Sequence, residues 1–182
     1  MAWDWQIEAT EFHRVPERLV PVYDFMNTVD ERTFGGRTPD DRLPDWLRER
    51  GEFSAAELQL AELLRKALRG MATVNRTGEP SEETAHDLAR ASRDLPLHAD
   101  SRLMLSPYQE GVTGNLAELL ATVVLTSADG SWSRMKTCAA PDCGWVFYDK
   151  SKPRNGRWCS TAGCGNRVKT RSYRERKGVH SS

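Results

Sequence analysis

The sequence predicts a mainly α-helical N-terminal domain with one small β-hairpin, followed by a small four-cysteine module in which a β-hairpin precedes a C-terminal helix. Three observations support this fold class. Apolar residues recur at helical spacing through most of the first 130 residues, all four cysteines fall between positions 138 and 164, and the charge changes sign near residue 130. We therefore divide the chain into residues 1–130 and residues 131–182.

The N-terminal residues contain most of the helical patterns. Ser54 and Glu57 form a capping-box sequence, which opens the longest helix. Pro21 moves the start of the first helix to Val20 or Pro21, because proline is tolerated in the first turn but not in the interior of a helix. We expect helices in the segments 17–29, 55–75, 80–93 and 113–128, and a short helix at Leu43, Trp46 and Leu47.

The segment 95–105 has a different pattern. Its apolar residues alternate with polar ones, and residues 99–101 have the composition of a turn. A period of two is typical of half-buried strands, so we expect a small hairpin here. The alternating apolar residues are Leu97, Ala99, Leu103 and Leu105.

The overall charge of zero hides a strong asymmetry. Residues 131–182 contain twelve basic and three acidic residues, a net charge of +9, so residues 1–130 carry −9. A basic tail on an acidic body favours a polyanionic partner for the tail. A solvated charged surface has the same composition, so the charge alone does not decide between the two interpretations.

Composition also limits the setting in which the protein acts. No stretch of about 18 uncharged apolar residues is present, so we expect no spanning helix and no membrane partner. The first residues, Met1 to Trp5, lack the basic and then apolar run of a signal peptide. We therefore expect a cytoplasmic protein, in which cysteines are more often metal ligands than disulfides.

The four cysteines form two matching pairs. Cys138 and Cys143 are separated by four residues, as are Cys159 and Cys164, and a glycine follows each pair. Two short-spaced pairs across one loop are the arrangement of a tetrahedral zinc site with no position left for a catalytic water. Two disulfides would need an oxidising compartment, and the C-x2-C spacing of redox centres is absent. We predict that the four cysteines hold one structural zinc ion.

The residues between the two pairs predict the hairpin of the module. Residues 144–148 have the pattern of a strand, and residues 150–156 that of a turn leading to a second short strand before Cys159. The aromatic residues between the two pairs are more typical of packing around the metal than of stacking on nucleic-acid bases. A module of this size has few other apolar side chains to form a core. Four thiolates on one zinc ion leave a charge of −2, which we expect three neighbours to offset: Lys136, Arg157 and Arg167.

The residues after Cys164 predict a basic helix that ends near Gly178. Arg167, Arg171 and Arg174 recur on one face, and a helix pinned at a zinc site with projecting arginines suits phosphate contacts and base-edge readout. A solvated, fraying terminal helix is the alternative. The candidate nucleic-acid-binding residues are Asn166, Arg167, Lys169, Arg171, Arg174 and Lys177.

The run Cys164-Gly165-Asn166-Arg167 resembles the CGNR zinc-finger family of bacterial proteins, and residues 141–144 and 157–160 match it as well. Residues 23–28, followed by Asp30, are similar to the ABATE-type domain that accompanies this finger. The resemblance implies a stress-responsive transcription regulator. In such a protein the finger holds zinc through the four cysteines and binds DNA, and the N-terminal domain senses a signal or binds a ligand.

Two functions of different classes follow. The first is a DNA-binding regulator, with RNA as an alternative nucleic acid. The second is a small-molecule sensor whose zinc module is a structural or oligomerisation element, for instance in a homodimer. In the second case Asp24, Asn27 and Asp30, together with His13, line a ligand pocket, although polar residues at helix ends more often serve as caps. No catalytic motif is present and the histidines are scattered, so we expect no enzymatic activity.

Overall fold

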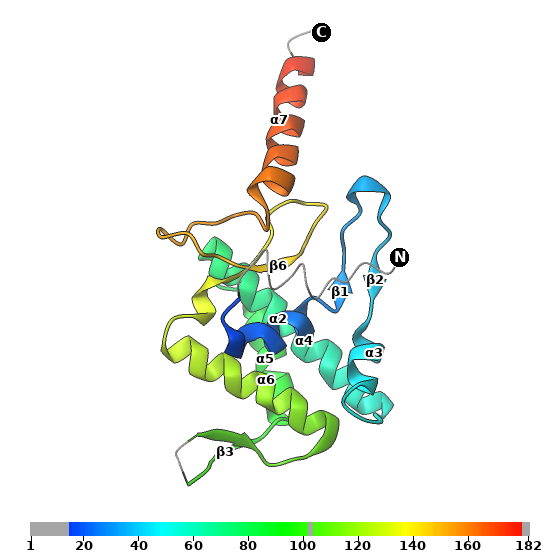
Figure 1. The fold of residues 1–182 in the computed structure, drawn as a ribbon, viewed down its shortest axis with the longest axis vertical. Coiled ribbons are helices and arrows are strands. Elements are labelled where there is room, and N and C mark those ends of the chain that lie inside the picture. Colours follow the sequence, from blue (N-terminus) through cyan, green and yellow to red (C-terminus); the bar gives the residue numbers. More distant parts are fainter. Residues whose placement is uncertain (1–14, 102–103, 180–182) are drawn as a thin grey trace.

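The protein is a helical body from which the C-terminal helix projects (Figure 1). The structure is a computed structural model that describes residues 15–101 and 104–179. Its α-helices are α2 (Val20–Met26), α3 (Leu43–Arg48), α4 (Ala55–Thr77), α5 (Glu82–Arg93), α6 (Gly111–Ala128) and α7 (Asn166–Val179). The shorter helical turns are η1 (Glu17–Leu19), η2 (Phe34–Gly36), η3 (Trp132–Arg134) and η4 (Thr161–Gly165). The mainly helical fold class is therefore confirmed.

Helices α2, α4 and α6 contact one another and form the core of the body. Phe25, Leu68 and Leu116, one from each helix, are fully buried. Helix α4 begins at the expected capping box, in which Ser54 Oγ accepts a hydrogen bond from the Glu57 N–H and the Glu57 carboxylate accepts one from the Ser54 N–H. Local sequence signals therefore determine where this long helix begins.

Helix α6 supplies much of the apolar core. Within the described part of the chain it is the helix that meets the length and mean hydropathy of a membrane span, with 18 residues and a value of 1.2, and 50% of that span is buried inside the protein. Leu116, Leu120 and Val123 on its buried side belong to the main hydrophobic cluster. Packing in this core accounts for the apolar composition of α6.

Within the described residues, three two-stranded antiparallel sheets lie around the helices. They are β1 (Val29–Asp30) with β2 (Asp40–Asp41), β3 (Leu97–Ala99) with β4 (Leu105–Pro107), and β5 (Met135–Thr137) with β6 (Val146–Tyr148). The β3–β4 pair is the hairpin that the alternating residues predict. The strand at 144–148 is also present, but its partner precedes Cys138 instead of Cys159. The first cysteine pair itself makes the turn of this hairpin, so residues 150–156 form a loop.

The main hydrophobic cluster extends across residue 130. Trp132, Met135 and Val146, from the C-terminal module, are buried in the same cluster as the helices of the body. Strand β5 lies along α4, where Asn75 Nδ2 donates hydrogen bonds to the carbonyls of Trp132 (2.9 Å) and Met135 (3.0 Å). The division at residue 130 stays a prediction about independent folding, and the apolar contacts cross it.

Candidate metal centre and nucleic-acid interface

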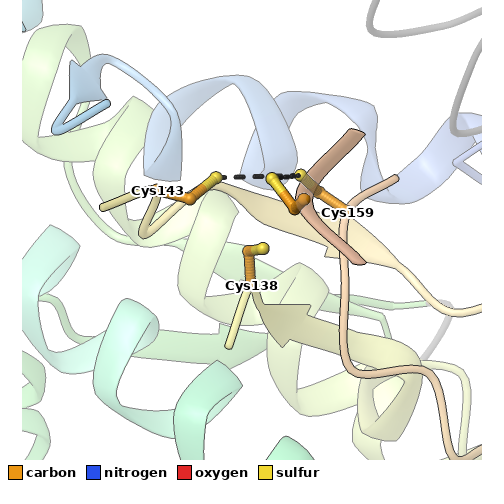
Figure 2. Close-up of side chains that lie close together, drawn as sticks. Cys138, Cys143 and Cys159 are labelled. Atoms are coloured by element: carbon orange, nitrogen blue, oxygen red, sulfur yellow. Dashed lines mark hydrogen bonds between the residues drawn. The ribbon is translucent and has the colours of Figure 1, made fainter. Parts of the chain in front are cut away.

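The hairpin and the loop before α7 bring the four cysteines together. Cys138 follows β5, Cys143 precedes β6, Cys159 ends the long loop and Cys164 lies in η4. Their sulfur atoms all lie within 4.8 Å of one another. The Cys143 and Cys159 sulfurs are 3.7 Å apart, and those of Cys159 and Cys164 are 3.5 Å apart. Figure 2 shows three of these side chains converging from separate segments of the chain.

This arrangement fits one zinc ion. Zinc–thiolate bonds of about 2.3 Å in a tetrahedron place the sulfur atoms about 3.8 Å apart, close to the two separations above. A disulfide needs about 2.05 Å between its sulfur atoms, and all four cysteines are free. Since four protein ligands complete the tetrahedron, the site is structural and has no open position for a substrate.

The glycine after each cysteine pair has its own structural reason. Gly144 has a positive φ of 63°, and a side chain there would meet the Glu31 carboxylate at 2.4 Å. Gly165 is helical, but a Cβ on it would come within 3.1 Å of the Trp158 ring. The backbone conformation at Gly144 therefore favours glycine, and close packing against an aromatic ring favours glycine at position 165.

Arg167 lies between the zinc site and the body. Its guanidinium pairs with Asp142 (2.7 Å), donates to the Cys164 sulfur (3.6 Å) and lies 3.6 Å from the centre of the Phe34 ring. The hydrogen bond to Asp142 raises the pKa of Arg167, and the same contact lowers the pKa of the Asp142 carboxyl. Arg167 thus offsets thiolate charge as expected. Lys136 pairs with Asp149 instead, and Arg157 lies over the Trp158 ring.

Two arginines of the body, which the sequence reasoning missed, also face the cysteine cluster. Arg32 lies 4.2 Å from the centre of the Trp145 ring and is attracted by the Cys143 and Cys159 thiolates. Arg69, on α4, donates to the carbonyl oxygen of Gly144 (3.1 Å). No local sequence signal marks these residues, because they reach the site only through the tertiary fold. The body therefore supplies part of the charge compensation for the metal centre.

Helix α2 makes further buried contacts with the hairpin. The Asn27 side chain is fully buried, donating to the Val146 carbonyl (3.1 Å) and accepting from the Val146 N–H (2.9 Å). The Trp145 indole donates to the Tyr23 hydroxyl (3.0 Å), and burial raises the pKa of that hydroxyl. These bonds fix strand β6 and the first cysteine pair against the body.

The three residues proposed to line a ligand pocket are not brought together. Asn27 is bonded to β6, and Asp30 forms an ion pair with Arg32. Asp24 lines a small pocket of about 130 Å³, which Thr28 and other residues complete: Arg42, Asp45, Trp46, Glu49 and Arg50. Burial raises the pKa of the Asp24 carboxyl to about 6. His13 lies outside the described residues.

The candidate nucleic-acid-binding residues all lie in the first three and a half turns of α7. Arg171 and Arg174 line one shallow surface with Arg167, as their spacing predicts. Lys169, Arg171, Arg174 and Lys177 are exposed, as is Asn166 in the first turn. Arg167 is half-buried and bonded at the metal centre. Contact with nucleic acid stays a prediction for these residues.

Comparison with known proteins agrees with the metal centre. A model of the CGNR zinc finger matches residues 134–177, from η3 through most of α7. An ABATE-type domain is not identified in the preceding residues. No curated protein matches the chain. The clustered cysteines and the family match agree on the same segment: residues 134–177 are a CGNR zinc finger.

Proposed function

We propose that this protein binds duplex DNA through α7 and regulates transcription in the bacterial cytoplasm. The observation that carries the proposal is the placement of α7, which begins at the zinc centre and projects away from the body (Figure 1). Its basic side chains from Lys169 onward are exposed. A CGNR zinc finger indicates nucleic-acid binding. The regulatory role is the finer part of the proposal and rests on the resemblance of the N-terminal residues to a sensory domain.

The ion pairs of the finger support a polyanionic partner. Of its three acidic residues, Asp142 is paired with Arg167 and Asp149 is buried against Lys136, so Glu175 is the exposed acidic residue. The exposed charged side chains of the finger are therefore mostly cationic, while the body is acidic overall. Because like charges repel, this polarity favours contact with phosphates through the finger and keeps the body away from them.

The proposed roles of individual residues follow from their exposure. Arg171 and Arg174 contact phosphates, and Lys169 and Lys177 widen the same cationic surface. Asn166, exposed at the metal-fixed end of α7, is the candidate for reading a base edge. Zinc has a structural role in this proposal and no step is catalytic, since all four ligands come from the chain.

The experiment compares two variants in fluorescence anisotropy titrations of a labelled mixed-sequence DNA duplex. Arg171→Ala/Arg174→Ala is expected to weaken binding and to reduce the slope of log affinity against log salt by about 0.9 for each phosphate that the variant no longer neutralises. Arg93→Ala, which removes an exposed arginine from α5, is the matched control and is expected to bind as the wild type does. Zinc content is measured for every variant.

If the double variant has the same DNA affinity and the same salt slope as the wild type, the nucleic-acid proposal is refuted. A parallel titration with single-stranded and duplex RNA separates the two nucleic acids, since the proposal requires duplex DNA to bind more tightly. Genome-wide recovery of bound DNA from cells then tests the regulatory part, which requires signal at discrete promoters.

A ligand sensor is the second candidate function, and the Asp24 pocket is the observation that favours it. Three carboxylates, two arginines and the Trp46 ring give this pocket polar and apolar surfaces within a small volume. Helix α2 carries Asp24, and its C-cap residue, Asn27, is bonded to the finger. In this candidate the finger is a structural or oligomerisation element, such as the contact of a homodimer.

A further inference from the structure

We infer that the loop of residues 150–157, hereafter the basic loop, is a second DNA-contacting element that engages the phosphate backbone beside the segment bound by α7. This inference rests on the proposed function. The basic loop projects to one side of the base of α7 (Figure 1). Its backbone conformation is fixed by hydrogen bonds within the finger, and it carries exposed cations at Lys152, Arg154 and Arg157.

A buried ion pair between Asp149 and Lys136 fixes the conformation of the basic loop. Asp149 and Lys136 pair at 2.8 Å with side chains that are 3% and 4% exposed. The Asp149 carboxylate also accepts hydrogen bonds from the backbone N–H groups of Ser151 (3.0 Å) and Gly156 (2.7 Å), near the two ends of the loop. Hydrogen bonds and the ion pair lower the pKa of Asp149 to about 2, against the effect of burial. One carboxylate therefore closes the loop on itself.

Further bonds fix the backbone of the loop. The Arg134 guanidinium donates to the carbonyls of Asp149 (2.8 Å) and Ser151 (3.0 Å), and Lys136 donates to the carbonyl of Arg154. Arg154 has a positive φ of 54°, a conformation that non-glycine residues rarely adopt. Such a backbone persists only where its surroundings determine it.

The close approach of Gly156 to Asp149 is specific to glycine. A Cβ at this position would lie 2.6 Å from one Asp149 carboxylate oxygen and 3.0 Å from the other. Any larger residue would push the loop away from the carboxylate that closes it. Gly156 therefore offers a way to alter the position of the loop without changing its charge.

The consequence is a set of exposed cations on a fixed backbone. Lys152, Arg154 and Arg157 are exposed, and in residues 15–101 and 104–179 none of them forms an ion pair. The carboxylate of Asp149 is turned inward. A buried ion pair is a weak source of stability compared with apolar packing, but the Asp149 carboxylate also bonds the loop backbone at Ser151 and Gly156. A fixed backbone loses less entropy when its side chains bind phosphates, so the arrangement suits binding.

The basic loop and α7 are fixed to the same metal centre. The Arg157 carbonyl accepts a hydrogen bond from the Ala139 N–H (2.8 Å), next to the first zinc ligand. Trp158 packs against Gly165, directly before α7. The two cationic elements are therefore held at a constant relative position on one small domain. Phosphates contacted by the basic loop and by α7 belong to one duplex.

The test uses the zinc-loaded full chain and the same labelled duplex over a salt series. Lys152→Ala/Arg154→Ala is expected to reduce the salt slope by about 0.9 for each phosphate left without its cation, which at about 100 mM salt weakens binding about 8-fold for one phosphate and about 60-fold for two. Gly156→Ala keeps every charge but displaces the loop, and it is expected to weaken binding. A reduced affinity in this variant shows that the position of the loop contributes to binding in addition to its charge. Arg93→Ala on α5 is again the matched control.

The outcomes separate this inference from the proposed function. A weaker affinity of Lys152→Ala/Arg154→Ala, with full zinc content, supports a second DNA-contacting element. If this variant behaves like Arg93→Ala while Arg171→Ala/Arg174→Ala weakens binding, the role of the basic loop is overturned and the proposed function stands. If the wild type does not bind duplex DNA, both fail. If Gly156→Ala retains zinc and wild-type affinity, the fixed loop position is overturned even where the cations matter.

Discussion

Asn27→Ala is the substitution that best tests how strongly the finger depends on the body. The Asn27 side chain is fully buried and makes both of its hydrogen bonds to the backbone of Val146 in β6. Alanine leaves that N–H and that carbonyl without partners in a buried environment, at about 1–3 kcal/mol for each group. The free energy of unfolding is expected to fall by about 2–6 kcal/mol, a large share of the about 5–15 kcal/mol typical of a folded domain.

Urea denaturation of the zinc-loaded protein, followed by far-UV circular dichroism, measures this change. Asn115→Ala is the matched control, because the Asn115 side chain donates to the Gly111 carbonyl one turn earlier in its own helix. We expect the control to change the free energy of unfolding by less than about 0.5 kcal/mol. Equal denaturation midpoints for the two variants would refute the conclusion that Asn27 holds β6 in place.

Two further predictions concern the metal and pH. Cys159→Ala is expected to reduce bound zinc from one ion per chain to near zero in elemental analysis; zinc-free wild type with two disulfides in mass spectrometry would contradict the metal centre. Asp24→Asn is expected to raise the free energy of unfolding at pH above about 6, where the carboxyl is charged, because burial raises its pKa from 3.8. This gain should disappear as the pH falls toward 3.8, and a pH-independent difference would argue against it.

Signals that are local in sequence predicted most of the fold. Helical periodicity placed the helices of the body, the capping box at Ser54 marked the start of α4, and alternation marked the β3–β4 hairpin. The spacing of the cysteines identified the metal ligands, because each pair of cysteines five positions apart supplies two sulfur atoms from one tight turn. Each of these features depends on residues a few positions apart, where spacing alone determines geometry.

Contacts between distant segments were not predictable in this way. Asn27 and Val146 are 119 positions apart, and the sequence indicated a helix cap or a ligand pocket as the role of Asn27, with no signal for its bonds to β6. The partner of strand β6 was misplaced for a related reason. Both 135–137 and the residues before Cys159 can pair with this strand, and the choice is made by packing of β5 along α4.

The same long-range contacts show that the finger is stabilised by the body as well as by its metal. A zinc module of this size usually relies on its metal and a few rings for stability. Here Met135 and Val146 are buried in the core of the body, and Arg32 and Arg69 bring positive charge to the cysteine cluster. The position of β6, and with it the first cysteine pair, therefore depends on α2 and α4. Since α7 begins at the metal, the orientation of the DNA-binding helix in our proposal is determined by the body as well as by zinc.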